Sequence, residues 1–264
     1  MLFRSTTTLA SVNRDGTVSG DKASSAPLIS GDGRRVIFES TATDLVAIPT
    51  GGTNNLFARD WPSGTTVLVS VNANGTAGGN GTSDSASISA DARFIAFVST
   101  ADDLAPGGTN RLGEIYVRDL AAGTTICAST GASGILRLTD PLRCFDPVIS
   151  ADGRYVVFKA ANAASTNLLR RDLPANSLAV VRANAVGPSS PEISDDGRFV
   201  AYEGLNQSIM DVFRWDAQSG TNKLVSLHRA AITSATPASH SPVMSPDGGT
   251  VAFLSRAGDR KSVV

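Results

Sequence analysis

One five-residue pattern recurs five times along the chain and limits its possible folds more than any other feature. The pattern is Ser, any residue, Asp, usually Gly and usually Arg, followed by a short apolar run that ends in an aromatic residue. Spacings of 59, 61, 44 and 51 residues separate the five aspartates, which are Asp32, Asp91, Asp152, Asp196 and Asp247. Repeats of this length are typical of propeller blades.

Each of these aspartates is expected to close a turn. Asp followed by Gly between two apolar runs indicates a hairpin, because the carboxylate binds nearby backbone N–H groups and glycine accepts a positive φ. Ala92 replaces the glycine in the second copy, and Gly249 replaces the arginine in the last. A recurring carboxylate would also suit a metal ligand or an acid catalyst, but Asx turns explain it without a ligand. We therefore interpret all five as structural turn residues.

A second hairpin pattern follows each of the first four copies. In the first unit an apolar run ends in Arg59-Asp60 and is followed by Gly64-Thr65-Thr66. The two patterns together predict four strands in a unit. In the third unit the predicted strands are residues 147–149, 155–158, 168–170 and 178–181. The second strand is apolar at consecutive positions, which is typical of a sheet covered on both faces, and no segment shows helical periodicity.

The sequence therefore predicts an all-β chain, a β-propeller of four-stranded antiparallel blades. Four blades are complete, and each end of the chain holds a half-blade. Residues 7–17 echo residues 66–76, which end the first full blade, whereas the C-terminal region holds only the first two strands of another. Pairing of Leu9-Ala10 with residues 251–253 would close a ring of five blades and remove exposed edges. The alternative is a fragment of a larger ring.

The last six residues abandon the repeat. We expect residues 1–258 to be propeller repeats from a fragment of a larger propeller protein. Residues 259–264, with the sequence Asp-Arg-Lys-Ser-Val-Val, resemble the translation of a sequencing adapter read through to its stop codon. We expect this tail to be an artefact of sequencing.

The repeat resembles that of the TolB-like, or WD-like, β-propellers of bacteria. The resemblance covers about residues 24 to 257 and rests on the Ser-x-Asp-Gly-Arg turn, the strand after it and the Arg-Asp-x-x-x-Gly-Thr hairpin. It implies a non-enzymatic scaffold for interactions. It also implies that the parent protein is periplasmic or extracellular.

Binding is expected on the face that carries the long loops. In an antiparallel blade, the loops from the second to the third strand lie on the same face as the connections between blades. Long irregular loops on a rigid scaffold are where binding usually resides. We expect a protein or glycan partner there. The candidate residues are Asp44, Asn54, Asp102, Asp103, Asn110 and Arg111.

Two of these loops repeat each other, one around Asp44 and one around Asp102-Asp103. Calcium favours clustered oxygen ligands, but the loops contain no Asp-x-Asp-x-Asp series, so loop packing is the favoured interpretation. Cys127 and Cys144 form no zinc motif and are expected to be buried thiols, with a disulfide left open. No metal and no cofactor is expected.

Charge and motif content argue against several other functions. The chain has 23 basic and 24 acidic residues, so it lacks the electrostatic footprint of a nucleic-acid binder. It has no apolar stretch near 18 residues, so no membrane insertion is expected.

No catalytic residue and no enzyme activity is expected. There are only two histidines, His228 and His240, and no nucleophile elbow or Gly-rich phosphate loop is present. The main alternative function is the gating propeller of a prolyl-oligopeptidase-like serine hydrolase whose catalytic domain is missing. Metal-dependent hydrolysis in the central channel, as in lactonases, has the least support.

Overall fold

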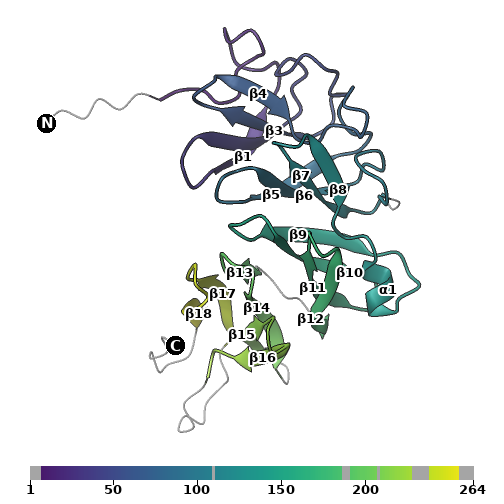
Figure 1. The fold of residues 1–264 in the computed structure, drawn as a ribbon, viewed down its shortest axis with the longest axis vertical. Helices are drawn as coiled ribbons and strands as arrows, with labels where there is room; N and C mark the ends of the chain where they lie inside the picture. Colours follow the sequence, from purple (N-terminus) through teal and green to yellow (C-terminus); the bar gives the residue numbers. More distant parts are fainter. Residues whose placement is uncertain (1–6, 109–110, 186–190, 207–208, 228–237, 256–264) are drawn as a thin grey trace, which may run out of the picture.

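Antiparallel sheets follow one another along an arc in chain order (Figure 1). The structure is a computed structural model that describes residues 7–108, 111–185, 191–206, 209–227 and 238–255. Four of its sheets have four strands each, which pair in chain order, and one has two. The predicted all-β propeller of four-stranded antiparallel blades is confirmed.

The four complete sheets are called blades 1 to 4, and the two-stranded sheet is half-blade 5. Blade 1 consists of β1 (Ser24–Ile29), β2 (Arg35–Ser40), β3 (Asn55–Asp60) and β4 (Thr65–Leu68). Blade 2 consists of β5 (Ser83–Ile88), β6 (Phe94–Ser99), β7 (Glu114–Asp119) and β8 (Thr124–Cys127). Every strand pair in these blades is antiparallel.

The strands predicted for the third unit all fall inside strands of blade 3. This blade consists of β9 (Arg143–Ile149), β10 (Tyr155–Ala161), β11 (Thr166–Asp172) and β12 (Ser177–Ala185). Blade 4 consists of β13 (Glu192–Ile193), β14 (Phe199–Asn206), β15 (Ile209–Asp216) and β16 (Thr221–Leu224). Half-blade 5 consists of β17 (Ser239–Met244) and β18 (Val251–Ser255).

One short helix departs from the prediction of strands and loops alone. Helix α1 (Ala132–Leu136) lies between blades 2 and 3, and left-handed residues border it at Gly131 and Arg137. Five residues give little more than one turn, which is too short to show a periodic apolar face in the sequence. Among the described residues no helix is long and apolar enough to cross a membrane.

The aromatic residue six positions after each turn aspartate lies on the second strand of its sheet. Phe97 belongs to one apolar cluster with Ile37 and Leu56 of blade 1. Phe158 shares a cluster with side chains of blade 2, and Tyr202 shares one with side chains of blade 3. All three are fully buried, and burying such a side chain contributes about 1.5–3 kcal/mol to folding. These aromatics pack the sheets against each other.

The first and last aromatics of this series pack differently. Phe38 clusters with Ala42, Leu45 and Val46 of the loop in its own unit and not with side chains of another blade. That loop covers the face of blade 1 that points away from blade 2. Phe253 of half-blade 5 is only partly buried against blade 4. Both residues belong to sheets at the ends of the arc, where the described residues place a sheet on one side only.

Closure of the ring by strand pairing is not formed among the described residues. The C-terminal half-blade is present as the hairpin β17–β18, and β18 pairs with β17 alone. Leu9 and Ala10 lie in no strand. The expected N-terminal half-blade contributes an isolated bridge between Val12 and Ser19. The tail 259–264 lies outside the described residues.

Candidate functional site

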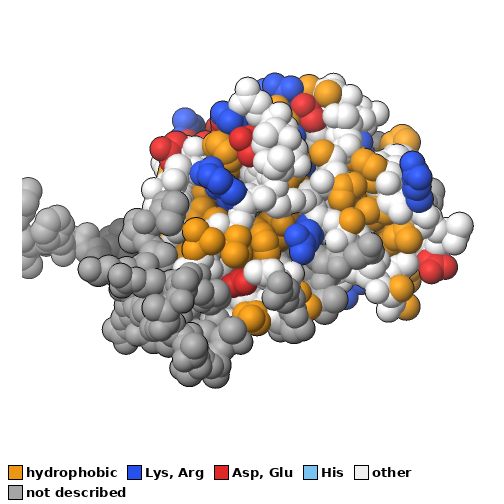
Figure 2. Space-filling view, turned by 90° about the horizontal axis from the view of Figure 1, so that it is seen from below, with side chains coloured by type: hydrophobic (Ala, Val, Ile, Leu, Met, Phe, Trp, Pro, Cys, Tyr) orange, Lys and Arg blue, Asp and Glu red, His pale blue; other side chains and the backbone are white. Residues whose placement is uncertain are grey.

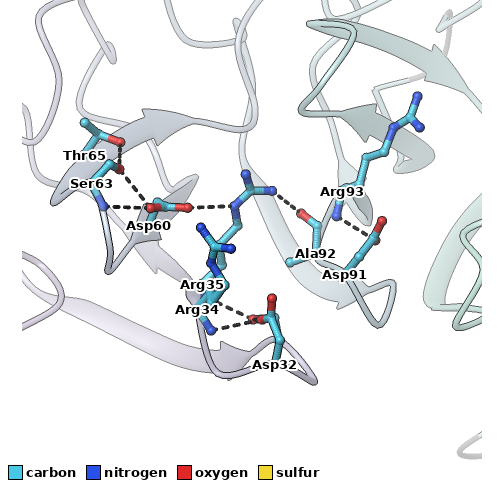
Figure 3. Close-up of polar contacts among 10 residues, drawn as sticks. Asp32, Arg34, Arg35, Asp60, Ser63, Thr65, Asp91, Ala92 and Arg93 are labelled. Carbon is cyan, nitrogen blue, oxygen red and sulfur yellow. Dashed lines mark hydrogen bonds and ion pairs between the residues drawn. The ribbon is translucent and has the colours of Figure 1, made fainter.

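The five turn aspartates have the same hydrogen bonds in every copy. Asp32 Oδ1 accepts a hydrogen bond from Ser30 Oγ at 2.6 Å and one from the Arg34 N–H at 3.0 Å (Figure 3). The Ser30 hydroxyl also accepts the Arg35 N–H. The Ser30 bond holds the pKa of Asp32 below its ordinary value. The other four turn aspartates accept equivalent hydrogen bonds, from the serine two residues before the aspartate and from the N–H two residues after it. These aspartates are Asp91, Asp152, Asp196 and Asp247. These carboxylates are therefore engaged within their own turns.

An arginine and an aspartate join the two hairpins of each blade. Arg93 forms two hydrogen bonds to Asp119, and Arg198 forms two to Asp216. These bonds lower the pKa of Asp119 and Asp216 to about 2. Arg154 and Asp172 repeat the arrangement in blade 3. The repeated ion pairs lie on the short-turn face and fix the ends of the strands.

In blade 1 the candidate residues of the long-loop face hold loops and sheets together. Asp44 Oδ1 accepts the Asp21 N–H at 3.0 Å, and the Asp44 carbonyl accepts the Arg14 N–H. Asn54 Nδ2 donates to Glu39 and to the carbonyl of Ser83, which begins blade 2. Both side chains therefore have structural partners.

Blade 2 repeats this arrangement and adds an exposed ion pair. Asp103 Oδ1 accepts the Asn80 N–H at 3.0 Å. Asp102 accepts Asn80 Nδ2 at 2.6 Å and Arg111 Nε at 2.8 Å, and these bonds lower its pKa. The Arg111 side chain is 67% exposed. Asn110 lies outside the described residues. Arg111 is thus the most exposed of the described candidates on this face.

One polar pair that joins the loops in each of these blades was not predicted from the sequence. In blade 1 Asp21 accepts two hydrogen bonds from Thr43. In blade 2 Asn80 stands where Asp21 stands, and Asp102 stands where Thr43 stands. The acid has changed sides while the contact between the loops is kept. Aligning residues 11–21 with 70–80 would have identified the pair, because both segments begin with Ser-Val-Asn.

A polar contact also fixes the start of the third strand. The Ser70 hydroxyl donates to Asn55 at 2.8 Å and accepts the Leu56 N–H. Glu114 and Ser129 form the corresponding contact in blade 2. Glu114 is buried, and this burial raises the pKa of its carboxyl.

Both cysteines lie close to this contact and are free, buried thiols. Cys127 Sγ is 3.5 Å from Ser129 Oγ. Burial raises the pKa of both thiols, so neither has the character of a reactive nucleophile. Cys144 lies within β9, the first strand of blade 3.

No cluster of three or more His, Cys, Asp or Glu side chains that could hold a metal ion exists within the described part of the chain. His240 contacts its neighbour Ser241, and His228 lies outside the described residues. On the face drawn in Figure 2, charged side chains of both signs are scattered among apolar ones. The coloured part of that face carries no continuous field of one sign.

A ring and a glycine form the joint between consecutive blades. Phe94, Tyr155 and Phe199 each occupy the third position after a turn aspartate. Each ring lies against the turn glycine of the next blade, so a Cβ on Gly197 would stand 2.0 Å from the Tyr155 ring. Gly153 and Gly248 approach their rings equally closely, at 2.2 and 2.3 Å. The turn glycine is therefore required by this close approach as well as by its positive φ.

The joint between blades 1 and 2 departs from this pattern and explains Ala92. Arg35 stands where the other blades have the ring, and it donates to the Ala92 carbonyl at 3.1 Å (Figure 3). The same guanidinium donates to Asp60 of its own blade. Without a ring against the turn, a Cβ fits at position 92, although Ala92 keeps a φ of 50°.

Comparison with known proteins identifies the fold through structure alone. No family model matches the chain, and no curated protein matches its sequence. Among solved structures, a protein of Agrobacterium tumefaciens assigned as a TolB is 16% identical with a TM-score of 0.54, over 90% of this chain and 72% of that one.

Two further solved structures are similar over most of this chain. The β-propeller domain of the Trilobed protease from Pyrococcus furiosus is 14% identical, with a TM-score of 0.56, over 91% of this chain and 65% of that one. Oligogalacturonate lyase from Vibrio parahaemolyticus is 12% identical, with a TM-score of 0.59, over 96% and 66%. At these identities the likeness establishes the fold and leaves activity open. The chain is a β-propeller that is similar in structure to TolB and to the propeller domain of a peptidase.

Proposed function

We propose that this chain is a non-catalytic scaffold that binds a protein or glycan through its long-loop face. The observation that carries the proposal is the occupation of the recurring carboxylates. The five turn aspartates and the four hairpin aspartates are engaged in hydrogen bonds that maintain the fold. A catalytic carboxylate needs access to its substrate, and these side chains serve the blades instead.

The long-loop face supplies the variable surface that a binding scaffold requires. Loops of this kind lie on a packed base, because Leu45 and Leu104 are buried beneath them. The exposed pair Arg111–Asp102 belongs to blade 2 and has no ion-pair counterpart in the loop of blade 1. We place the partner at this pair. The periplasmic or extracellular location of the parent protein stays an expectation from the resemblance to TolB-like repeats.

Two measurements on the purified chain test this proposal. Incubation with peptide, ester and glycoside substrates should give no turnover, whereas turnover that a single substitution abolishes would contradict a non-catalytic role. Screening against a glycan array and a displayed peptide library should give a ligand whose binding Arg111→Ala weakens at least tenfold. Arg198→Ala is the matched control, because it removes an ion pair on the opposite face. If the control substitution weakened binding more than Arg111→Ala, the ligand would bind on the short-turn face, which would contradict the proposal.

The gating propeller of a serine hydrolase stays the alternative. The similar peptidase propeller domain shares a fold at 14% identity, which does not favour that role over a scaffold. The isolated chain is enough to distinguish a binding scaffold from a gating propeller, because a scaffold binds its ligand without a hydrolase domain. Failure of every binding screen would favour the alternative.

A further inference from the structure

The joints between blades differ in one respect that none of the features above explains. At three of the four joints an arginine of one blade donates to the carbonyl of the turn residue in the next. Arg35 donates to Ala92, Arg170 donates to Gly197 at 2.7 Å, and Arg214 donates to Gly248 at 2.9 Å. Within the described residues no side chain donates to the Gly153 carbonyl at the joint between blades 2 and 3.

The missing arginine has a definite place in the repeat. Arg170 and Arg214 stand two residues before the hairpin aspartates Asp172 and Asp216. The same position in blade 2 is Val117, two residues before Asp119. Strand register confirms the equivalence, because each of these three residues is opposite the fourth-strand residue in the same place of its hairpin.

The structure leaves a cavity of about 410 Å³ at this place. Its lining includes Phe94, Val117, Asp119, Asp152, Gly153 and Arg154. The volume lies within the range of about 300–1,000 Å³ that is usual for ligand sites. The cavity is on the short-turn face, opposite the loops assigned to the proposed partner.

The filled joints show which chemical group this cavity suits. Arg170 lies over the Tyr155 ring at 3.7 Å from its centroid, and Arg214 lies over the Phe199 ring at 4.5 Å. Phe94 is the equivalent ring at the joint of blades 2 and 3. A guanidinium over an aromatic ring gains a cation–π attraction, and its planar donors reach a carbonyl at the same time.

The neighbouring arginines do not occupy this place. Arg93 lies over Phe94 at 4.7 Å, but Arg154 and Arg198 have the same relation to Tyr155 and Phe199, at 4.8 and 4.7 Å. Those rings therefore accept two arginines each, and Phe94 has one. At the joint of blades 3 and 4 the fold therefore accommodates a second guanidinium, that of Arg170, beside the ion pair of Arg154 and Asp172.

We propose that the joint between blades 2 and 3 is a binding site for an arginine side chain of a partner protein. The guanidinium would lie over the Phe94 ring and donate to the Gly153 carbonyl. Arg154 also lines the cavity, and Asp119 and Asp152 keep their hydrogen bonds to their own blades, so the ring and the carbonyl are the groups that hold the guanidinium. The half-exposed Ile126 side chain provides apolar contact for the methylene stem of the arginine. This inference does not depend on the proposed function, since it concerns the opposite face.

The probe for this site is the blocked peptide acetyl-Gly-Arg-Gly-amide. Its binding is measured from the amide NMR signals of the ¹⁵N-labelled chain. We expect saturable shifts in the millimolar range, centred on Gly153 and Phe94. Matched peptides with norleucine or lysine in place of arginine should bind at least fivefold more weakly. Equal binding of the norleucine peptide would overturn the charge assignment, and equal binding of the lysine peptide would overturn the choice of guanidinium.

Two substitutions test the location. Val117→Arg should fill the site from within, as Arg170 does in blade 3, and should weaken binding of the arginine peptide at least tenfold. Val67→Arg, which adds an arginine at an exposed position of blade 1, is its control and should leave binding within twofold. Undiminished binding to a folded Val117→Arg chain would contradict the proposal.

Opening a filled joint provides an independent arm if Val117→Arg does not fold. Arg170→Ala removes the guanidinium from the joint of blades 3 and 4. The arginine peptide should then produce new shifts at Gly197 that the unaltered chain does not show. Absence of those shifts in the folded variant would show that a vacant joint does not recruit arginine, which overturns the inference.

Discussion

Blades 1 and 2 differ from blades 3 and 4 in the length of the connection between their second and third strands. In the first pair, a long connection separates the second and third strands, over residues 41–54 in blade 1 and between Ser99 and Glu114 in blade 2. In the second pair, these connections are short, because Ala161 pairs with Thr166 and Asn206 pairs with Ile209. The strands are correspondingly longer, at seven and eight residues against six.

The same two pairs also differ at their joints. Blade 3 meets the turn of blade 4 through a ring, a glycine and an arginine, whereas at the turn of blade 2 Arg35 takes the place of the ring and Ala92 that of the glycine. The joint of blades 2 and 3 has the ring and the glycine without the arginine. The turn hydrogen bonds are identical in all of them. The repeat thus keeps the contacts that form each hairpin and varies those that connect one blade to the next.

The largest expected effect concerns the apolar packing between blades. Phe158→Ala should lower the free energy of unfolding by about 3–5 kcal/mol, because the side chain is fully buried between two rigid sheets. Phe38→Ala should fall at the low end of this range, since its cover is a loop that can collapse into the space. Urea unfolding measures both. A larger loss for Phe38 would reverse this comparison of sheet and loop.

The next effect separates the two reasons for a turn glycine. Gly197→Ala combines a φ of 68° with a Cβ 2.0 Å from Tyr155, whereas Gly33→Ala has a φ of 70° and open space. Left-handed backbone alone costs about 1–2 kcal/mol, and overpacking adds about 1–3 kcal/mol. Thermal unfolding should therefore show a greater loss for Gly197→Ala. Equal losses would mean that the ring yields and that the joint is not tightly packed.

A smaller effect concerns the hairpin ion pairs. Arg198 lowers the pKa of Asp216 to about 2, below the ordinary value of about 3.9. The depressed pKa contributes stability that is present above about pH 4 and is lost as the pH falls towards 2. Arg198→Gln should lower the melting temperature at pH 7, and the difference from the unaltered chain should narrow by pH 2. Because Arg198 is partly exposed, solvent screens the pair and keeps its contribution to stability small.

The control for this pH series is Arg111→Gln on the long-loop face. The Arg111 side chain is more exposed than that of Arg198, so its removal should change the melting temperature less at every pH. A pH-independent difference between Arg198→Gln and the unaltered chain would assign the effect to packing of Arg198 on Phe199 instead of charge.

The smallest effect concerns Glu114 and its counterpart in blade 1, the amide Asn55. Burial raises the pKa of Glu114, so its protonated form is favoured in the folded chain. Stability is therefore present below the ordinary glutamate pKa and is lost as the pH rises through the raised one. Glu114→Gln should raise the melting temperature at pH 7 and change it less at pH 4. Asn55→Asp should lower the melting temperature at pH 7. If neither substitution changes the melting temperature as expected, burial does not control the charge at this position.

Much of the fold could be predicted because its hairpins depend on neighbouring residues. The hydrogen bonds of the first turn join Ser30, Asp32 and Arg34 within five positions, and the four other copies form the same bonds. The strands between these turns follow from apolar runs that only a covered sheet could bury. The helix α1 escaped prediction because one turn has no period.

The candidate site was harder to predict. The sequence identified Asp44 and Asp102 as members of repeated loops, but it did not identify Asp21 and Asn80, which lie about 22 residues earlier and pair with these loops. Such pairs depend on how a loop folds back over its sheet. No local pattern specifies that path.

By itself, the sequence determined the blade, its turns and the order of its strands, because each needs only partners a few residues away. The tertiary structure alone decided how the blades join. Ala92 is tolerated at a turn because Arg35, 57 residues earlier, replaces a ring. Val117 leaves a cavity only because Gly153 of the next blade lies beside it. These relations arise from packing one sheet on another, where steric fit and hydrogen bonding act between residues that are distant in the chain.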